Sequence, residues 1–187
     1  QSVNSWLPDG SGFYYSCKPL EGTVPEGEHE YWHQTWLHRL GTGPEQDEKI
    51  FWDDETKETW NAVYLTEDGR YEIFMRGLFN VNDLWFRPAG SDREPVALAT
   101  GMQAEYGADF VGDTILITTD EGAPRKMVYV TDVDHPEREH WEVWLPEHPE
   151  DKLNGISPIA GHVYASYSHD AYTVVKIHDL AGEYLRD

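Results

Sequence analysis

The chain has 187 residues, and its 35 acidic side chains against 14 basic ones give a formal net charge of −21. A field of this sign repels nucleic-acid phosphates and anionic membrane surfaces, so the composition argues against both partners. No apolar run approaches the roughly 18 residues that a membrane-spanning helix needs. Aromatic residues make up 13% of the chain, which is typical of packed sheets and not of a disordered chain.

The acidic excess has two interpretations. It is a solvated surface that keeps the protein soluble, or it is an adaptation to high salt, where ions screen the self-repulsion. Cys17 is the only cysteine, so the chain has no internal disulfide, and we expect a buried structural thiol in a cytoplasmic protein. The chain begins with Gln1 and not with Met, from which we expect a processed or trimmed N-terminus.

A unit made of a glycine turn and strand-like runs recurs four times along the chain. The turn glycines are Gly10, Gly69, Gly112 and Gly161, spaced 59, 43 and 49 residues apart. Each turn is followed by runs rich in β-branched and aromatic residues, which favour strands. The predicted strands include, in chain order, residues 13–15, 35–40, 61–65, 71–75, 83–87, 114–118, 127–131, 163–167 and 173–178.

A period of roughly 40 to 50 residues with about four short strands per unit is typical of β-propeller blades. We therefore predict an all-β fold, a β-propeller or partial propeller of about four antiparallel four-stranded blades. One domain is expected over residues 1–187, with units at approximately 1–59, 60–103, 104–152 and 153–187. The polar segment 21–30 is expected to connect the second and third strands of the first unit, and 146–154 to cross over between units.

One motif suggests a metal site. His29, Glu30 and His33 fit the zinc-protease pattern His-Glu-x-x-His, which needs a helix to bring both imidazoles to one side. The segment follows Pro25 and Gly27 and leads into a predicted strand, and the sequence offers no third ligand. We interpret the match as accidental and predict no metal and no cofactor; a helix over these residues would decide otherwise.

Fragments of a serine triad also occur. His169-Asp170 and His178-Asp179 pair an imidazole with a carboxylate in sequence, but a triad needs a nucleophile on a sharp elbow, marked Gly-x-Ser-x-Gly. Ser11 lies in a hairpin turn and Ser157 precedes a proline, so neither fits.

Two carboxylate pairs, Asp53-Asp54 and Asp132/Asp134, have the chemistry for acid–base work or for binding a cation. In the loops of so acidic a chain, such residues are usually solvated surface. With neither a triad nor a persuasive carboxylate pair, we predict no catalytic residues in this chain.

Short segments in order along the chain carry a resemblance to a known family. They are residues 6–15, 38–42, 65–71, 82–86, 105–106, 118–125, 145–148, 168–170 and 178–182. Together they resemble successive propeller strands of the prolyl oligopeptidases over essentially the whole chain. Members of that family join an α/β-hydrolase domain with a Ser-Asp-His triad to a seven-bladed propeller whose tunnel restricts substrates to short peptides. The resemblance implies about four of those blades and no catalytic domain.

The resemblance implies a substrate-gating, non-catalytic part of a serine peptidase that cleaves short proline-containing peptides. Its expected partners are a peptide or protein, the missing α/β-hydrolase domain, and a second copy bound through exposed blade flanks. If Arg87 lies where the end of a third strand faces the peptide cavity, it contacts substrate carboxylates; the alternative is an ordinary exposed arginine. The alternative function is a free-standing small propeller that binds a peptide or protein without enzymatic activity. Hydrolysis by this chain itself would rest on His29 and His33 alone.

Overall fold

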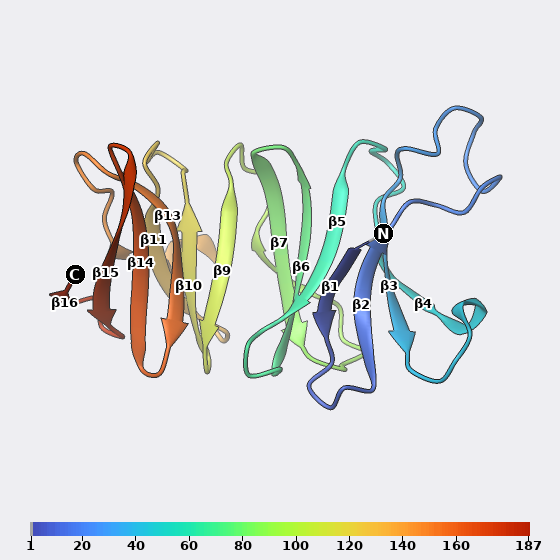
Figure 1. The fold of residues 1–187 in the computed structure, drawn as a ribbon, viewed down its shortest axis with the longest axis horizontal. Coiled ribbons are helices and arrows are strands. Elements are labelled where there is room, and N and C mark those ends of the chain that lie inside the picture. The colour runs from blue at the N-terminus through green and yellow to red at the C-terminus, as the bar shows by residue number, and fades with distance from the viewer. Residues whose placement is uncertain (1) are drawn as a thin grey trace. The chain divides into compact units, whose positions relative to one another are not determined.

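The fold consists almost entirely of β-strands. The computed structural model describes residues 2–187, which form sixteen strands and two single-turn 3-10 helices. The strands make four antiparallel sheets, each of four strands that are consecutive in the chain (Figure 1). The predicted all-β fold of four-stranded antiparallel sheets is confirmed. Among the described residues, no helix is long and apolar enough to cross a bilayer.

The four sheets follow one another along the chain. The first holds β1 (Ser2–Trp6), β2 (Gly12–Cys17), β3 (Gln34–Arg39) and β4 (Glu48–Trp52), with η1 (Pro44–Gln46) before its last strand. The second holds β5 (Trp60–Leu65), β6 (Tyr71–Leu78), β7 (Val81–Pro88) and β8 (Val96–Ala99). The third holds β9 (Tyr106–Val111), β10 (Thr114–Thr119), β11 (Met127–Asp132) and β12 (Glu142–Leu145), with η2 (Arg138–His140) before β12. The fourth holds β13 (Lys152–Ile159), β14 (His162–His169), β15 (Tyr172–Asp179) and β16 (Tyr184–Arg186).

The four turn glycines occupy equivalent places, since each lies between the first and second strands of its sheet. Their φ angles are all positive: 69° at Gly10, 69° at Gly69, 63° at Gly112 and 79° at Gly161. Residues that carry a side chain rarely adopt this left-handed backbone conformation, which explains why glycine recurs at these positions. At Gly69 a side chain would also collide with the ring of Pro8.

The two predicted connections are found at about their expected places. Segment 21–30 lies between β2 and β3, as predicted. The crossover predicted over 146–154 is wrong at its end, because β13 already begins at Lys152. Lys152 pairs with Ser168, and Leu153 is only 1% exposed, so the pairing and burial of these residues extend the strand into the polar segment.

All four sheets share one irregularity in the pairing of their third and fourth strands. The register shifts once there, between Thr35/Trp36, Leu84/Trp85, Val128/Tyr129 and Ile177/His178. Each shift leaves one extra residue in the last strand, which is a β-bulge that bends that strand and increases its twist. The extra residues are Ile50, Leu98, Trp144 and Leu185.

The chain divides into two compact units, residues 1–102 and 103–187, each with two sheets. In the first unit, Tyr14 and Leu37 of the first sheet form one buried cluster with Val63 and Phe74 of the second. The ring of Phe51 meets that of Phe74 edge to face at 5.3 Å between centroids. The two sheets of this unit are therefore joined by an apolar core.

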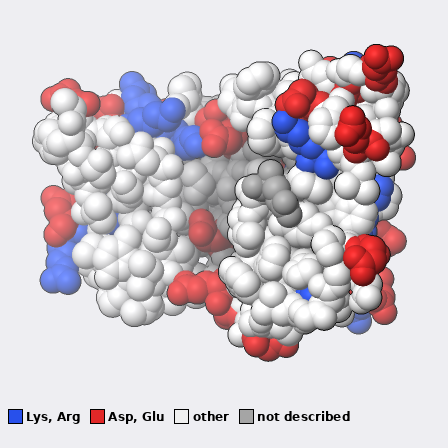
Figure 2. All heavy atoms as spheres, turned by 45° about the vertical axis from the view of Figure 1, so that its right-hand side comes forward, with Lys and Arg blue, Asp and Glu red and all other residues white. Residues whose placement is uncertain are grey.

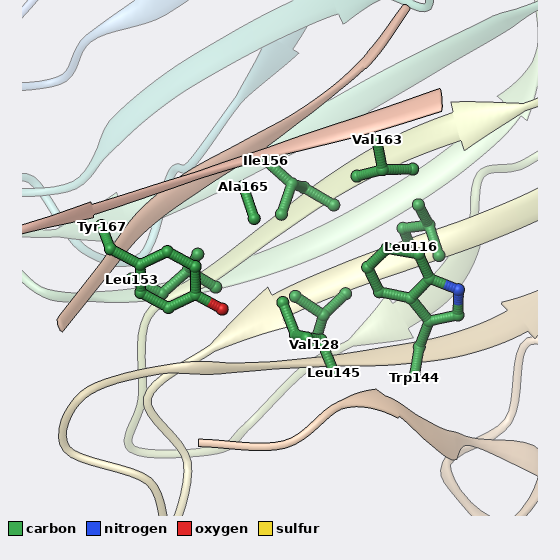
Figure 3. Packing of buried hydrophobic residues seen from close by; sticks show 9 residues of the cluster. All are labelled: Leu116, Val128, Trp144, Leu145, Leu153, Ile156, Val163, Ala165 and Tyr167. Carbon is green, nitrogen blue, oxygen red and sulfur yellow. The ribbon is translucent and has the colours of Figure 1, made fainter. Parts of the chain in front are cut away.

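In the second unit the core also joins two sheets. Figure 3 shows nine side chains that face one another between them. Leu116, Val128, Trp144 and Leu145 come from the third sheet, and Leu153, Ile156, Val163, Ala165 and Tyr167 from the fourth. Burying a large side chain of this kind stabilises the fold by about 1.5–3 kcal/mol, so this cluster helps to hold the two sheets together.

Candidate functional site

A hollow in the first unit lies beside the first strands of its two sheets. It has a volume of about 360 Å³, and its lining includes Asn4 of β1, His33, and Trp60, Asn61 and Tyr64 of β5. The hollow therefore combines amide and imidazole groups with two aromatic rings, which is the composition expected of a ligand-binding surface.

Hydrogen bonds fix the polar side of this hollow. Asn61 is 3% exposed, and its Nδ2 donates to the carbonyl of His33 at 2.9 Å. The Ser16 hydroxyl donates to the carbonyl of Asn61 at 2.8 Å and accepts from Asn4 Nδ2 at 2.8 Å. Asn61 Oδ1 and His33 Nδ1 are buried without a hydrogen-bond partner. A buried polar atom left unpaired costs free energy, so both atoms favour a partner.

The aromatic side of the hollow is open to solvent. The His33 ring stacks on Trp60 at 4.4 Å between centroids and 15° between planes. The Trp60 side chain is 62% exposed and that of Tyr64 is 39% exposed. The pKa of His33 is lowered from its ordinary value, first by burial and then by the charge of Lys18. The imidazole and the two accessible rings give this side of the hollow an aromatic surface, and Lys18 adds a positive charge to its lining.

The zinc-protease pattern does not form the helix that it requires. Residues 29–33 make a turn and a bend, with Trp32 in the left-handed region at φ 60°. Glu30 pairs with Lys18, and His33 stacks on Trp60. Within residues 2–187, no three His, Cys, Asp or Glu side chains are placed to hold a metal ion.

Arg87 is engaged inside the first unit. Its Nε donates to Glu72 Oε2 at 2.6 Å, its guanidinium lies 5.0 Å from the Phe74 ring centroid, and its side chain is 20% exposed. The alternative of an ordinary exposed arginine is wrong, because β7 directs the side chain towards the buried carboxylate of Glu72. Contact between Arg87 and a substrate stays a prediction.

The triad fragments face other partners. His169 Nδ1 lies 2.5 Å from Asp151 Oδ1, and its neighbour Asp170 is 3.9 Å from Nε2. His178 is 5% exposed and its Nδ1 faces the carbonyl of Gly182 at 3.1 Å. Ser157 pairs with Tyr164 within the fourth sheet. These contacts fix strands and turns.

The carboxylate pairs cap turns. Asp53 is 8% exposed and accepts hydrogen bonds from the amides of Glu55 and Thr56, at 2.9 and 3.1 Å. Asp132 accepts from the amides of Asp134 and His135, both at 2.9 Å. Asp53 is thus a buried structural group, contrary to the solvated surface that we expected, because its side chain replaces backbone hydrogen bonds in a tight turn.

Sequence analysis missed Trp60 and Asn61 as candidate site residues. Trp60 belongs to a run that reads as an ordinary strand, and an asparagine within it gives no motif. The only signal was the asparagine itself, since polar amides are depleted in strands.

The family model of the prolyl oligopeptidase N-terminal β-propeller domain matches residues 1–187. The prolyl endopeptidase of Elizabethkingia miricola is 31% identical to this chain over 98% of its length, and that of Elizabethkingia meningoseptica is 33% identical over 97%. The chain spans about a quarter of these relatives, 26% of each.

Solved structures agree. A chain from a structural and mechanistic analysis of two prolyl endopeptidases matches with a TM-score of 0.89 and 29% identity, over 97% of this chain and 27% of that one. Prolyl oligopeptidase B of Galerina marginata, bound to a 35mer hydrolysis and macrocyclization substrate, has the same fold, with a TM-score of 0.85 and 22% identity over 98% of this chain and 27% of its own. The sheets and these matches define a β-propeller domain. More particularly, the chain belongs to the prolyl oligopeptidase N-terminal β-propeller family.

Proposed function

We propose that this chain is the substrate-gating part of a prolyl-oligopeptidase-type serine peptidase that cleaves short proline-containing peptides. An α/β-hydrolase domain elsewhere in the same protein carries out the catalysis. The observation that carries the proposal is the match of all 187 residues to the N-terminal propeller family at about a quarter of its relatives' length.

The residues support a gating role more than a catalytic one. The histidines of the triad fragments and the carboxylate pairs hold turns and strands, and the hollow beside β1 and β5 presents aromatic and amide groups instead of an acid–base pair. Such a surface binds and orients a peptide without reacting with it.

A direct test compares cleavage by two proteins. The native gene product is expected to hydrolyse a short proline-containing peptide much faster than a long one, and the 187-residue chain alone is expected to hydrolyse neither. Turnover by the chain alone would contradict the proposal. So would equal rates on short and long peptides by the native product.

The hollow can be tested by substituting its exposed ring. Trp60→Ala is expected to weaken binding of a proline-containing peptide by about 1 kcal/mol, close to a fivefold rise in Kd. Trp52→Ala is the matched control, because Trp52 is 43% exposed on the outer strand β4. Equal effects of the two substitutions would remove the hollow from the proposal.

The single cysteine, which leaves this chain without an internal disulfide, supports a cytoplasmic location, since disulfides form and persist mainly in oxidising compartments. Fractionation of source cells tests this: recovery of the protein outside the cytoplasm would contradict it.

In the isolated chain we expect self-association through the fourth sheet. Tyr172, Val175, Tyr184 and Leu185 of β15 and β16 are 42–60% exposed, and exposed apolar side chains favour association. Light scattering of the isolated chain is expected to give a dimer; a monomer at all accessible concentrations would contradict this.

A further inference from the structure

Of the asparagines in the chain, Asn154 alone is followed by a glycine. Asn154 and Gly155 lie in β13, the first strand of the fourth sheet. The side-chain amide of an asparagine is most open to attack by the next backbone nitrogen when that nitrogen belongs to glycine, because no Cβ blocks the approach. The proposed function makes no use of this pair.

β13 carries a bulge at this point. Leu153 pairs with Tyr167 and Gly155 pairs with Ser166 of β14, so Asn154 is an extra residue with no residue opposite it. A bulge disrupts the ladder of backbone hydrogen bonds locally. A regular strand holds each peptide group in that ladder, whereas the unpaired Asn154 has more freedom to turn its side chain towards the next amide.

The Asn154 side chain is held at its oxygen and is open to solvent. Asn154 and Ser168 are both exposed, and the Ser168 hydroxyl donates to Asn154 Oδ1 at 2.8 Å. A donor at this oxygen stabilises the negative charge that develops there when a nucleophile adds to Cγ. Because the site is exposed, water can enter and ammonia can leave.

The backbone and the packing do not require a glycine at position 155. A Cβ built on Gly155 meets no atom within 4 Å, and the φ of this residue lies outside the left-handed region. Gly69 is different, since its φ is positive and a Cβ there would collide with Pro8. The chemistry at Gly155 can therefore be changed without a collision in the sheet.

We propose that Asn154 is a site of spontaneous deamidation, with the Gly155 nitrogen as nucleophile and the Ser168 hydroxyl as donor to the oxyanion. The Gly155 nitrogen loses its proton to hydroxide and bonds to Asn154 Cγ, which closes a succinimide ring. The Cγ–Nδ2 bond breaks, and Nδ2 takes a proton from water and leaves as ammonia. Water then opens the ring, at Cγ to give aspartate or at the main-chain carbonyl carbon to give isoaspartate.

The two products have different effects on the sheet. Aspartate keeps an acceptor for the Ser168 hydroxyl and adds a negative charge, whereas isoaspartate also inserts a methylene group into the main chain. Leu153 and Ile156 flank the site and are 1% and 8% exposed in the cluster between the third and fourth sheets. We therefore expect isoaspartate to loosen this packing.

Peptide mapping of the native gene product tests the proposal. After incubation in mildly alkaline buffer, the peptide that holds residue 154 is expected to contain both aspartate and isoaspartate, and isoaspartate marks the succinimide route. The rate is expected to fall severalfold in mildly acidic buffer, because the Gly155 amide must lose its proton before it attacks. Asn80 is the internal control and is expected to stay intact, since it is exposed in the β6–β7 hairpin but is followed by the branched Val81.

A synthetic peptide of residues 150–158 gives the reference rate of the same segment without a fold. If Asn154 stayed intact in the protein while the peptide reacted, the proposal would be overturned. Isoaspartate at Asn80 as fast as at Asn154 would also contradict it, because the reaction would then not depend on the glycine.

Two variants of the native gene product test the two roles. Gly155→Ala is expected to slow the reaction severalfold, and an unchanged rate would exclude the Gly155 nitrogen as nucleophile. Ser168→Ala is expected to slow it about fivefold, as for the loss of a single hydrogen bond. Ser157→Ala, at another exposed serine next to the site on β13, is the matched control and keeps the wild-type rate. An unchanged or faster reaction in Ser168→Ala would exclude the role of the hydroxyl.

Discussion

Glu72 is the residue at which the polar contacts between the first two sheets converge. It is 2% exposed and accepts from the Tyr14 hydroxyl at 2.7 Å, from Arg87 Nε at 2.6 Å and from the Gly90 amide at 3.0 Å. Burial, and then the bond to Glu72, raises the pKa of Tyr14. The carboxylate thus joins β2 of one sheet to β6 and β7 of the next.

Truncating this carboxylate is expected to destabilise the protein strongly. Glu72→Ala leaves the Arg87 charge and the Tyr14 hydroxyl without their partner, which should cost about 3 kcal/mol of unfolding free energy. Urea unfolding measures this loss of free energy. Glu67→Ala is the control, because Glu67 lies in an exposed turn. Equal midpoints for the two variants would show that the network contributes nothing.

Asp109 on β9 makes the stability of the fold fall as the pH rises, whereas a carboxylate paired with a cation makes it rise. Burial raises its pKa to about 6, from 3.8. Stability is therefore lost as the pH rises from about 4 to about 6, because the unfolded chain ionises first, and the cost persists above that range. Asp109→Asn should stabilise the protein at pH 7 by about 2 to 3 kcal/mol and flatten this fall. Unchanged unfolding curves at pH 4 and pH 7 would contradict the assignment.

Residue-level prediction succeeded where a backbone conformation dictates the amino acid and failed where partners come from distant strands. Gly10 and Gly69 were identified because a positive φ leaves little choice but glycine. Arg87 and Glu72 are 15 positions apart, and Asp151 and His169 are 18 apart, so no local pattern announces either pair. Asn61 was missed for the same reason, since its partner is the carbonyl of His33.

Among the elements, the bulged last strands show how the four sheets repeat. The extra residue is apolar in all four sheets. In two of them it is buried, since Leu98 is 5% exposed and Trp144 is 9% exposed. Trp144 also donates from Nε1 to the carbonyl of Leu180 at 3.1 Å. Runs rich in β-branched and aromatic residues predicted the second and third strands of every sheet, whereas the bulges depend on pairing between strands and were not predictable.

Trp144→Ala removes both the packing and the hydrogen bond at one bulge. We expect it to lower the free energy of unfolding by about 3 kcal/mol, as for other large aromatic side chains in cores. Val143→Ala, at the neighbouring 56% exposed position, should change it by less than about 0.5 kcal/mol. Chemical denaturation of both variants decides; a small effect at Trp144 would mean that the bulge is not part of the core.

At the scale of the whole molecule, the charge of −21 is the dominant electrostatic feature. Figure 2 shows acidic side chains spread over the drawn face, with uncharged surface between them. If the excess is an adaptation to high salt, the unfolding temperature should keep rising well beyond about 0.15 M salt, where ordinary screening is already strong. Thermal unfolding across a sodium chloride series measures this. A plateau near that concentration would favour a merely solvated acidic surface.

The central claim is that this chain is one part of a larger peptidase, and the mass of the native gene product in its source cells tests it most directly. Intact-protein mass spectrometry is expected to give a mass several-fold above the 21.5 kDa of this chain, in keeping with relatives of which it spans 26%. A native mass near 21.5 kDa would contradict the account and would make the protein a free-standing propeller that binds its partner without chemistry of its own.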